Sequence, residues 1–301
     1  MPYGRLIRAY QATEGRRSPA EWSHQVTACL RETPIDPGSA ATLFVVARAL
    51  QSPAMAPLED RCRAHGLAPG PCVEETRRPP APEAGLRVFL AVGPLIWTFL
   101  QGLAIAAIAW LEARNYTVLC DPATDGAGAH LLEHGLWPEY VEAVARFHRA
   151  LAAHSPLDRV IVLDPLVLQT LIDHGQWTGL EVPCPVVPFW ETLGELPAAG
   201  WPEGDSVLLD VTPTTRAATP ALARWLERAG ATVTPIPESL RVGAPLAIHE
   251  RALGVIFRLT RAKAEWLSTQ QDPLITADPL TLLREKKARH LLGAFGIEGG
   301  S

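Results

Sequence analysis

An eight-residue pattern, Ile-x-x-Asp-Pro-Leu-x-Leu, occurs twice in this chain, at residues 161–168 (IVLDPLVL) and 275–282 (ITADPLTL). The two copies are 114 residues apart, and each one follows a helix-like stretch and ends a short apolar run. A self-match at such a long period is typical of a duplicated supersecondary unit. The repeat therefore predicts two similar α/β halves within one chain.

Composition limits the class of protein. Of the 301 residues, 48% are hydrophobic and 20% are charged, which is typical of a globular protein. The formal net charge is −5 and Lys and Arg form no dense cluster, so a nucleic-acid partner is not expected. The cysteines are five in number, share no Cys-x-x-Cys pair and follow an N-terminus without an apolar signal segment. This favours reduced thiols and a cytoplasmic location.

Residues 88–111 are long and apolar enough to raise the question of a membrane span, because their only polar side chains are Thr98 and Gln101. One hypothesis is a membrane-inserted subunit. The other is a buried corner of a soluble fold: strand 88–92, a turn at Gly93-Pro94, a helix over 95–113 and a strand over 116–120. Gly93-Pro94 interrupts the run, so we favour the buried corner, with at most peripheral association with membranes.

Strands and helices are expected to alternate in the same order in both halves, which indicates parallel sheets with helices on their faces. The predicted fold class is α/β, with two tandem halves and a short N-terminal helical region. The predicted boundaries are a helical region at 1–65, a Pro/Gly-rich linker at 66–85, a first half at 86–197, a second half at 198–292 and a tail at 293–301.

This element order resembles the duplicated cysteine-rich (CCG) domains of the heterodisulfide reductase B/D subunits, which also occur in the iron–sulfur subunits of glycolate and lactate oxidation. In that family, a Gly-Cys or Cys-His loop, a Cys-Cys-Gly loop and a Cys-Pro-x-Cys segment follow successive strands and hold an iron–sulfur cluster. The similarity covers roughly residues 86–292 and includes the segment FWETLGEL between the halves. Residues 26–50 also resemble part of a two-cluster ferredoxin, of whose cysteines only Cys29 remains.

The chain departs from the family at its cluster ligands. Other residues stand at the positions that the resemblance assigns to them, and these side chains do not replace thiolates on such a cluster. We therefore expect no cofactor and no metal. The degenerate cluster positions are Pro94, Gly126, Ala127, Asp164 and Val167 in the first half, and Thr212, Arg241, Val242, Asp278 and Thr281 in the second.

Asp164 and Asp278 allow two interpretations. An Asp-Pro pair after a strand is a good helix start, with the carboxylate as the N-cap and Pro at the first helical position. Alternatively, the two carboxylates and Arg216 are polar groups of an interdomain cleft that binds a cation or moves protons. The resemblance matches Arg216 to a family arginine, and here it could pair with Asp210 or with a carboxylate of the other half.

His130 and His134 lie four residues apart with Glu133 between them. This spacing places two imidazoles on one face of a helix, as metal ligands require. HLLEH is not the His-Glu-x-x-His motif, and no third ligand is evident. We expect them to be surface or loop-packing histidines.

The leading hypothesis for function is a non-catalytic scaffold or accessory subunit of a heterodisulfide reductase-like electron-transfer complex, not an enzyme on its own. Its expected partners are flavin or iron–sulfur proteins, including an intact paralogue. The alternatives are an enzyme or metal-binding protein that uses Asp164 and Asp278, and the membrane-inserted subunit described above.

Overall fold

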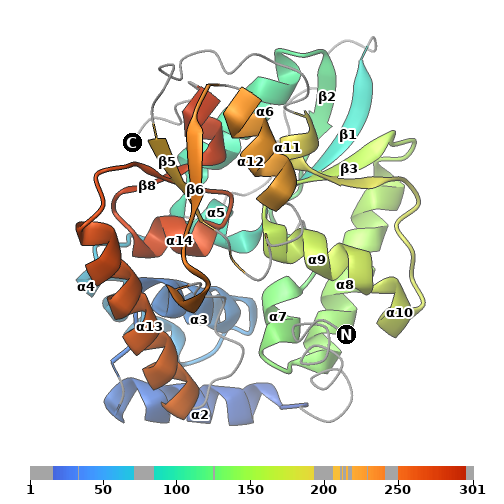
Figure 1. The fold of residues 1–301 in the computed structure, drawn as a ribbon. Coiled ribbons are helices and arrows are strands. Elements are labelled where there is room, and N and C mark those ends of the chain that lie inside the picture. The colour runs from blue at the N-terminus through green and yellow to red at the C-terminus, as the bar shows by residue number, and fades with distance from the viewer. Residues whose placement is uncertain are drawn as a thin grey trace. The chain divides into compact units, whose positions relative to one another are not determined.

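The computed structural model describes residues 16–32, 34–70, 85–124, 126–192, 206–210, 212, 215, 219–228, 230–240 and 250–295. The chain is an α/β protein in which two four-stranded sheets each have all of their strands parallel (Figure 1). The fold class predicted from the alternation of apolar segments is confirmed. Most of the predicted linker falls on residues 71–84, outside the described residues.

The first sheet has the strand order β2-β1-β3-β4. Its central strand β1 is buried from Val88 to Ala91, as expected for a strand with neighbours on both sides and helices on its faces. The strands are β1 (Leu86–Ala91), β2 (Tyr116–Leu119), β3 (Arg159–Val162) and β4 (Val186–Pro188), and the helices are α5 (Pro94–Phe99), α6 (Gln101–Glu112), α7 (Ala129–Glu133), α8 (Trp137–Ala153), α9 (Pro165–Asp173), α10 (Gly175–Thr178) and α11 (Phe189–Thr192).

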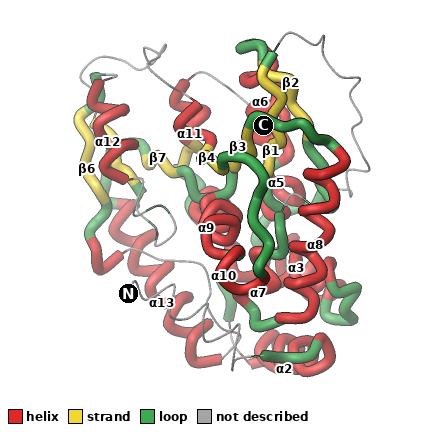
Figure 2. Tube along the Cα trace, turned by 90° about the vertical axis from the view of Figure 1, so that its right-hand side faces the viewer, coloured by secondary structure: helices red, strands yellow, loops and turns green. Residues whose placement is uncertain are grey.

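The second sheet has the order β6-β5-β7-β8, which is the same arrangement of second, first, third and fourth strand. Helix α12 lies beside strand β6 (Figure 2). The strands are β5 (Ser206–Leu209), β6 (Thr232–Pro235), β7 (Leu274–Thr276) and β8 (Ala288–His290), and the helical elements are α12 (Thr219–Arg228), η1 (Glu238–Leu240), α13 (Glu250–Ser268), α14 (Pro279–Arg284) and η2 (Leu291–Phe295).

Strands β4 and β8 were not predicted. Each contains only three residues, which is too short for a hydrophobic period to be recognised, and β4 ends in a proline. Both strands pair in parallel with the third strand of their half, at the edge of the sheet. The sheets are therefore one strand wider than the sequence indicated.

The helix expected over 95–113 is broken, which corrects the prediction of one continuous helix. Leu100 has φ −133° and ψ 40° and separates α5 from α6. The carbonyl of Thr98, which a continuous helix would use internally, instead accepts a hydrogen bond of 2.7 Å from the backbone N–H of Gly70. Among the described residues, no helix combines the length and apolar character that crossing a bilayer requires.

The N-terminal helices are α2 (Pro19–Glu32), α3 (Pro37–Ala49) and α4 (Met55–Ala64). The residues Asp36-Pro37-Gly38-Ser39 before an apolar run predict a capped helix start. The structure confirms it, because Asp36 is the N-cap of α3 and accepts a hydrogen bond of 3.1 Å from the backbone N–H of Ser39. Contacts group residues 1–69, 130–137 and 201–291 into one compact unit, and residues 70–129, 138–200 and 292–301 into another. The domain boundaries proposed from the sequence stay a prediction.

Candidate functional site

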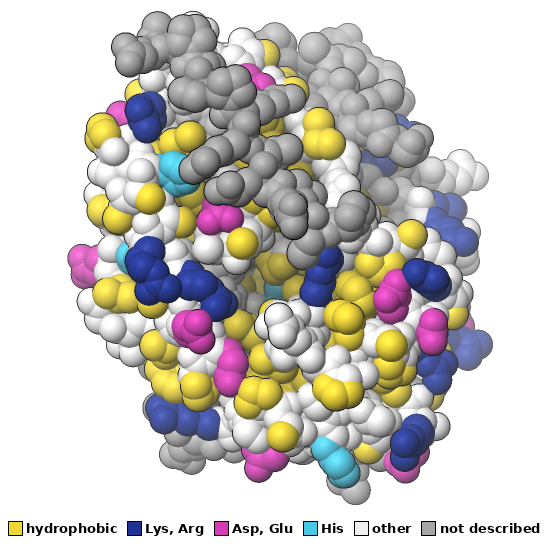
Figure 3. Space-filling view, turned by 180° about the vertical axis from the view of Figure 1, so that it is seen from behind, with side chains coloured by type: hydrophobic (Ala, Val, Ile, Leu, Met, Phe, Trp, Pro, Cys, Tyr) yellow, Lys and Arg dark blue, Asp and Glu magenta, His cyan; other side chains and the backbone are white. Residues whose placement is uncertain are grey.

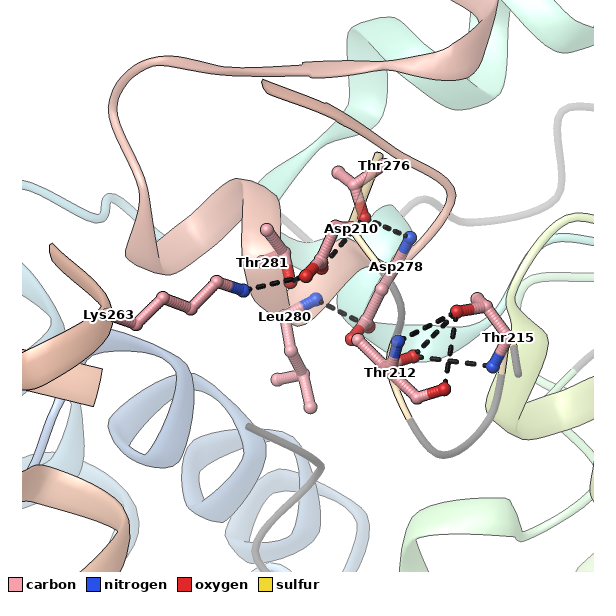
Figure 4. Close-up of polar contacts among 8 residues, drawn as sticks. All are labelled: Asp210, Thr212, Thr215, Lys263, Thr276, Asp278, Leu280 and Thr281. Carbon is pink, nitrogen blue, oxygen red and sulfur yellow. Dashed lines mark hydrogen bonds and ion pairs between the residues drawn. The ribbon is translucent and has the colours of Figure 1, made fainter. Parts of the chain in front are cut away.

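The carboxyl ends of parallel strands are where open α/β sheets usually bind ligands. In the second half, buried polar side chains gather at the ends of β5 and β7 (Figure 4). We refer to Asp210, Lys263, Thr276, Asp278 and Thr281 as the polar cluster. Asp210 directly follows β5, Thr276 ends β7, Asp278 and Thr281 belong to the start of α14, and Lys263 comes from α13.

Asp210 is the centre of the polar cluster. Its carboxylate accepts a hydrogen bond of 2.8 Å from Lys263 Nζ, one of 3.3 Å from Thr276 Oγ1, and a third from the hydroxyl of Thr281. Asp210 and Lys263 are each only 2% exposed, so both charges have lost their water. An ion pair in such a place is tolerated only when hydrogen bonds complete its geometry, as the two threonines do here.

Asp278 is the N-cap of α14. Its Oδ1 accepts a hydrogen bond of 3.0 Å from the backbone N–H of Leu280, and its own backbone N–H donates to Thr276 Oγ1 at 3.0 Å. Burial, together with the negative charge of Asp210, raises the pKa of Asp278 to about 6. A carboxyl group with this pKa exchanges its proton near neutral pH, which is a property of general acids and bases.

The loop after β5 is held by a pair of threonines. The backbone N–H of Thr212 donates to Thr215 Oγ1 at 2.9 Å, and the backbone N–H of Thr215 donates to Thr212 Oγ1 at 3.3 Å (Figure 4). Side-chain bonds of this kind stabilise a turn without help from the sheet. Arg216, Arg241 and Val242, which the sequence placed in these loops, lie outside the described residues.

A second ion pair ties α14 to the N-terminal helices. Arg284 Nε donates to Asp36 Oδ1, and both side chains are buried. Burial by itself would raise the pKa of Asp36, but the charge and hydrogen bond of Arg284 outweigh it and hold that pKa below its usual value. Asp36 thus caps α3 and also anchors the end of α14.

In the first half, the predicted positions meet in a tightly packed arrangement at the ends of β1 and β3. Asp164 is the N-cap of α9 and accepts a hydrogen bond of 2.8 Å from the backbone N–H of Leu166. A Cβ atom added to Gly93 would lie 2.7 Å from Asp164 Oδ2, and one added to Gly126 would lie 2.7 Å from Pro94 Cδ. The three loops after β1, β2 and β3 therefore lie directly against one another.

Corresponding positions in the two halves carry opposite chemistry. Ala91 is paired with Val162 across β1 and β3, one residue beyond the pair of Leu90 with Ile161. In the second half Leu209 is paired with Ile275, so Asp210 and Thr276 follow at the equivalent places. The 114-residue offset likewise relates Val167 to Thr281. The first half fills these places with a buried apolar cluster (Ala91, Val162, Val167) and the second with an ion pair and hydroxyls (Asp210, Thr276, Thr281).

His130 and His134 are buried, with 3% and 1% exposure. His130 belongs to α7 and His134 directly follows it, and the possibility that they lie on the surface is wrong. The ring of His134 contacts Trp22 edge-on, with centroids 6.0 Å apart. Burial lowers the pKa of His130 to about 4 and that of His134 to about 3, so both are neutral at pH 7. Trp22 comes from α2, and this contact accounts for the position of His134.

The residues present do not fit an iron–sulfur cluster. Among the described degenerate positions the side chains are apolar, hydroxyl or carboxylate groups, while such clusters need thiolates. Cys120 and Cys184 are not joined in disulfides, and burial raises the pKa of Cys184 and disfavours its thiolate form. In the part of the chain that the structure describes, no three His, Cys, Asp or Glu side chains are arranged to hold a metal ion.

Sequence reasoning missed Lys263. It lies in the amphipathic helix α13, where lysines are usually solvent-exposed, and no local pattern distinguished it. Lys263 forms an ion pair with Asp210, and the pairing of Asp210 with Arg216 stays a prediction because Arg216 lies outside the described residues. Asp164 and Asp278 belong to different compact units, and each is a helix cap within its own.

No family model matches this chain, and no curated protein sequence is significantly similar to it.

Proposed function

We propose that this protein is a non-catalytic, cofactor-free scaffold subunit of a heterodisulfide reductase-like redox complex, in contact with flavin or iron–sulfur proteins. The observation that carries the proposal is the direct packing of the loops at the strand ends of the first half. Gly93, Asp164, Gly126 and Pro94 leave no space even for an added Cβ atom. Close packing of this kind leaves the strand ends filled by protein atoms, which supports a fold without a cofactor at this place.

The second half supports the same proposal in a different way. Its strand ends are filled by the polar cluster, in which the negative charge of Asp210 is balanced by Lys263 and two threonine hydroxyls. Both halves are therefore closed by protein groups alone. What remains for function is the surface. On the face drawn in Figure 3, basic and acidic side chains of the described residues are interspersed with apolar ones.

Anaerobic purification followed by reconstitution with ferrous iron and sulfide tests the cofactor part. We expect no stoichiometric iron and no charge-transfer absorbance. One cluster per chain would contradict the proposal. As a matched control, the Cys120→Ser and Cys184→Ser double variant should behave as wild type in the same experiment.

Affinity purification of the complex from its native cells tests the partner part. We expect flavin or iron–sulfur subunits to be retained with the wild-type chain and with the double cysteine variant. Retention of neither type of partner, with the chain isolated as a monomer, would contradict the scaffold role.

A second candidate function is proton transfer or cation binding at Asp278. It is favoured by the pKa of about 6 and by the neighbouring Asp210–Lys263 pair. It predicts that Asp278→Asn abolishes the binding of Mg²⁺ or Mn²⁺ without unfolding the protein. Wild-type binding in that variant, or none in the wild type, removes the cation-binding form of this candidate.

A further inference from the structure

A pair of histidines in the first half lies outside the sites described above. His148 belongs to α8, and His174 immediately follows α9. Their Nε2 atoms are 3.0 Å apart, and their ring centroids are 5.2 Å apart. His174 is buried and His148 is partly exposed, so the pair can be reached from the side of His148.

The hydrogen bonds define the form of His174. Its Nδ1 lies 2.6 Å from the carbonyl oxygen of Leu171, which only accepts, so Nδ1 carries the hydrogen. The Nε2 atom of His174 therefore has a lone pair directed at His148, which accepts a hydrogen bond of 3.0 Å from His148 Nε2–H. Metal-binding histidines are typically held in this way, with the second ring nitrogen donating to a backbone carbonyl.

The two rings are close enough to become ligands of one metal ion after a local rearrangement. With metal–nitrogen distances of about 2.05 Å and a tetrahedral angle, two imidazole nitrogens lie about 3.3 Å apart and their ring centroids about 5.2 Å apart. With the nitrogens 3.0 Å apart and the centroids 5.2 Å apart, the two rings now point almost straight at each other, as in an N–H···N hydrogen bond. To share one ion, the nitrogens separate by a few tenths of an ångström and the partly exposed His148 ring turns, so that both lone pairs point to the metal. The tautomer of His148 changes in the process, so that its Nδ1 carries the hydrogen.

The electrostatic surroundings also suit a cation. Burial lowers the pKa of both histidines below the usual value, which keeps them neutral and available as ligands at pH 7. The carboxylate of Glu181 is close enough to act in the opposite direction on the pKa of His174. Glu181 is exposed, and its Cγ atom would lie 3.6 Å from a Cβ atom added to Gly175, next to His174.

We propose that His148 and His174 form a two-histidine site for a divalent transition-metal ion of the Zn²⁺ class. Among the described residues no third ligand is already in place. Water therefore completes the coordination, and the negative charge of Glu181 stabilises the bound cation. The site is independent of the strand-end positions and of the scaffold function proposed above.

The test uses the full-length, untagged protein after removal of metals with a chelator. Zn²⁺ is titrated in competition with a chromophoric indicator, and Co²⁺ is followed by its visible absorption. We expect one equivalent bound by the wild type, and at least a tenfold loss of affinity, as an order-of-magnitude figure, in His148→Gln and in His174→Ala. His154→Ala is the matched control, because His154 packs against Phe89 and should leave binding unchanged.

Because His174 is buried, circular dichroism and the thermal midpoint of each variant are recorded alongside. His148 is partly exposed, so His148→Gln is expected to fold and tests the site even if His174→Ala does not. Absence of binding by the wild type, or wild-type affinity in a folded His148→Gln protein, would overturn the proposal.

Discussion

The two halves have the same sheet order and the same Asp-Pro helix start, yet they close their strand ends differently. The first half uses a buried apolar cluster (Ala91, Val162, Val167), and the second uses the ion pair of Asp210 with Lys263 and two hydroxyls. The backbone arrangement is therefore compatible with either solution. The two solutions should differ in how much stability a single substitution removes. In an apolar cluster a smaller side chain costs only its own packing, whereas removing one charge of a buried ion pair leaves the other charge buried without a partner.

The largest difference should appear when the central carboxylate is removed. Asp210→Ala leaves the Lys263 ammonium group buried without its counter-charge, and we expect a loss of about 3–5 kcal/mol in the free energy of unfolding, measured with urea. Arg146→Ala, which removes an exposed ion pair with Glu142, is the control and should cost less than about 1 kcal/mol. A loss below that level for Asp210→Ala would mean that the pair is not buried.

The pH dependence of stability should distinguish the two capping aspartates. The folded pKa of Asp278 is about 6, above its ordinary value of 3.8, so the folded state binds more proton between these values. The Asp278 carboxyl therefore contributes most to the free energy of unfolding below pH 3.8. That contribution is lost as the pH rises through 6, and the total change is roughly 3 kcal/mol at most. Asp278→Asn should thus gain in stability over the wild type as the pH rises from 4 to 7.

Asp164→Asn is the matched change in the first half and reports what the replacement of a cap does by itself. Each variant is compared with wild type at the same pH, because His130 and His134 make the protein more stable as the pH rises, whereas Asp278 makes it less stable. Their folded pKa values are lowered, so they destabilise the fold as the pH falls below 6.5. An Asp278→Asn curve parallel to that of wild type would contradict the raised pKa.

Replacing the buried ion pair of the polar cluster by apolar side chains, as in the first half, should recover the stability that Asp210→Ala loses. The combined variant Asp210→Ala, Lys263→Leu, Thr281→Val removes the ion pair and the hydroxyl of Thr281, and it keeps Thr276 Oγ1 as the acceptor of the Asp278 backbone N–H. We expect a stability between that of wild type and about 1–4 kcal/mol above it, as found when buried ion pairs are replaced by apolar groups. A combined variant less stable than Asp210→Ala alone would show that the two closures are not interchangeable.

The smallest effect concerns the helix caps. Asp164→Ala should cost about 1 kcal/mol in urea unfolding at pH 7, because the N–H of Leu166 loses its partner. Asp278→Ala should cost less, since at pH 7 the charge of Asp278 is itself unfavourable where it is buried. A larger cost for Asp278→Ala would reverse this order.

The sequence predicted the regular elements well where their pattern is long. The apolar periodicity predicts a helix over 137–153 and a strand over 159–163; α8 has those limits, and β3 ends one residue earlier. The Asp-Pro capping interpretation is confirmed for Asp164 and Asp278, because a cap depends on contacts within three residues. The break at Leu100 was not predicted, since the competing hydrogen bond comes from Gly70, distant in sequence.

The sequence by itself determined two parallel α/β halves and their capped Asp-Pro helix starts, because periodicity and capping are properties of short segments. The tertiary structure decided which groups meet: Lys263 reaches Asp210 across 53 residues, and His148 reaches His174 across 26. Contacts between residues so far apart in the sequence depend on strand register and helix packing, which short sequence patterns do not reveal. The repeat of the Ile-x-x-Asp-Pro-Leu-x-Leu pattern indicated that corresponding positions exist, and only the fold showed that one half fills them with apolar side chains and the other with charge.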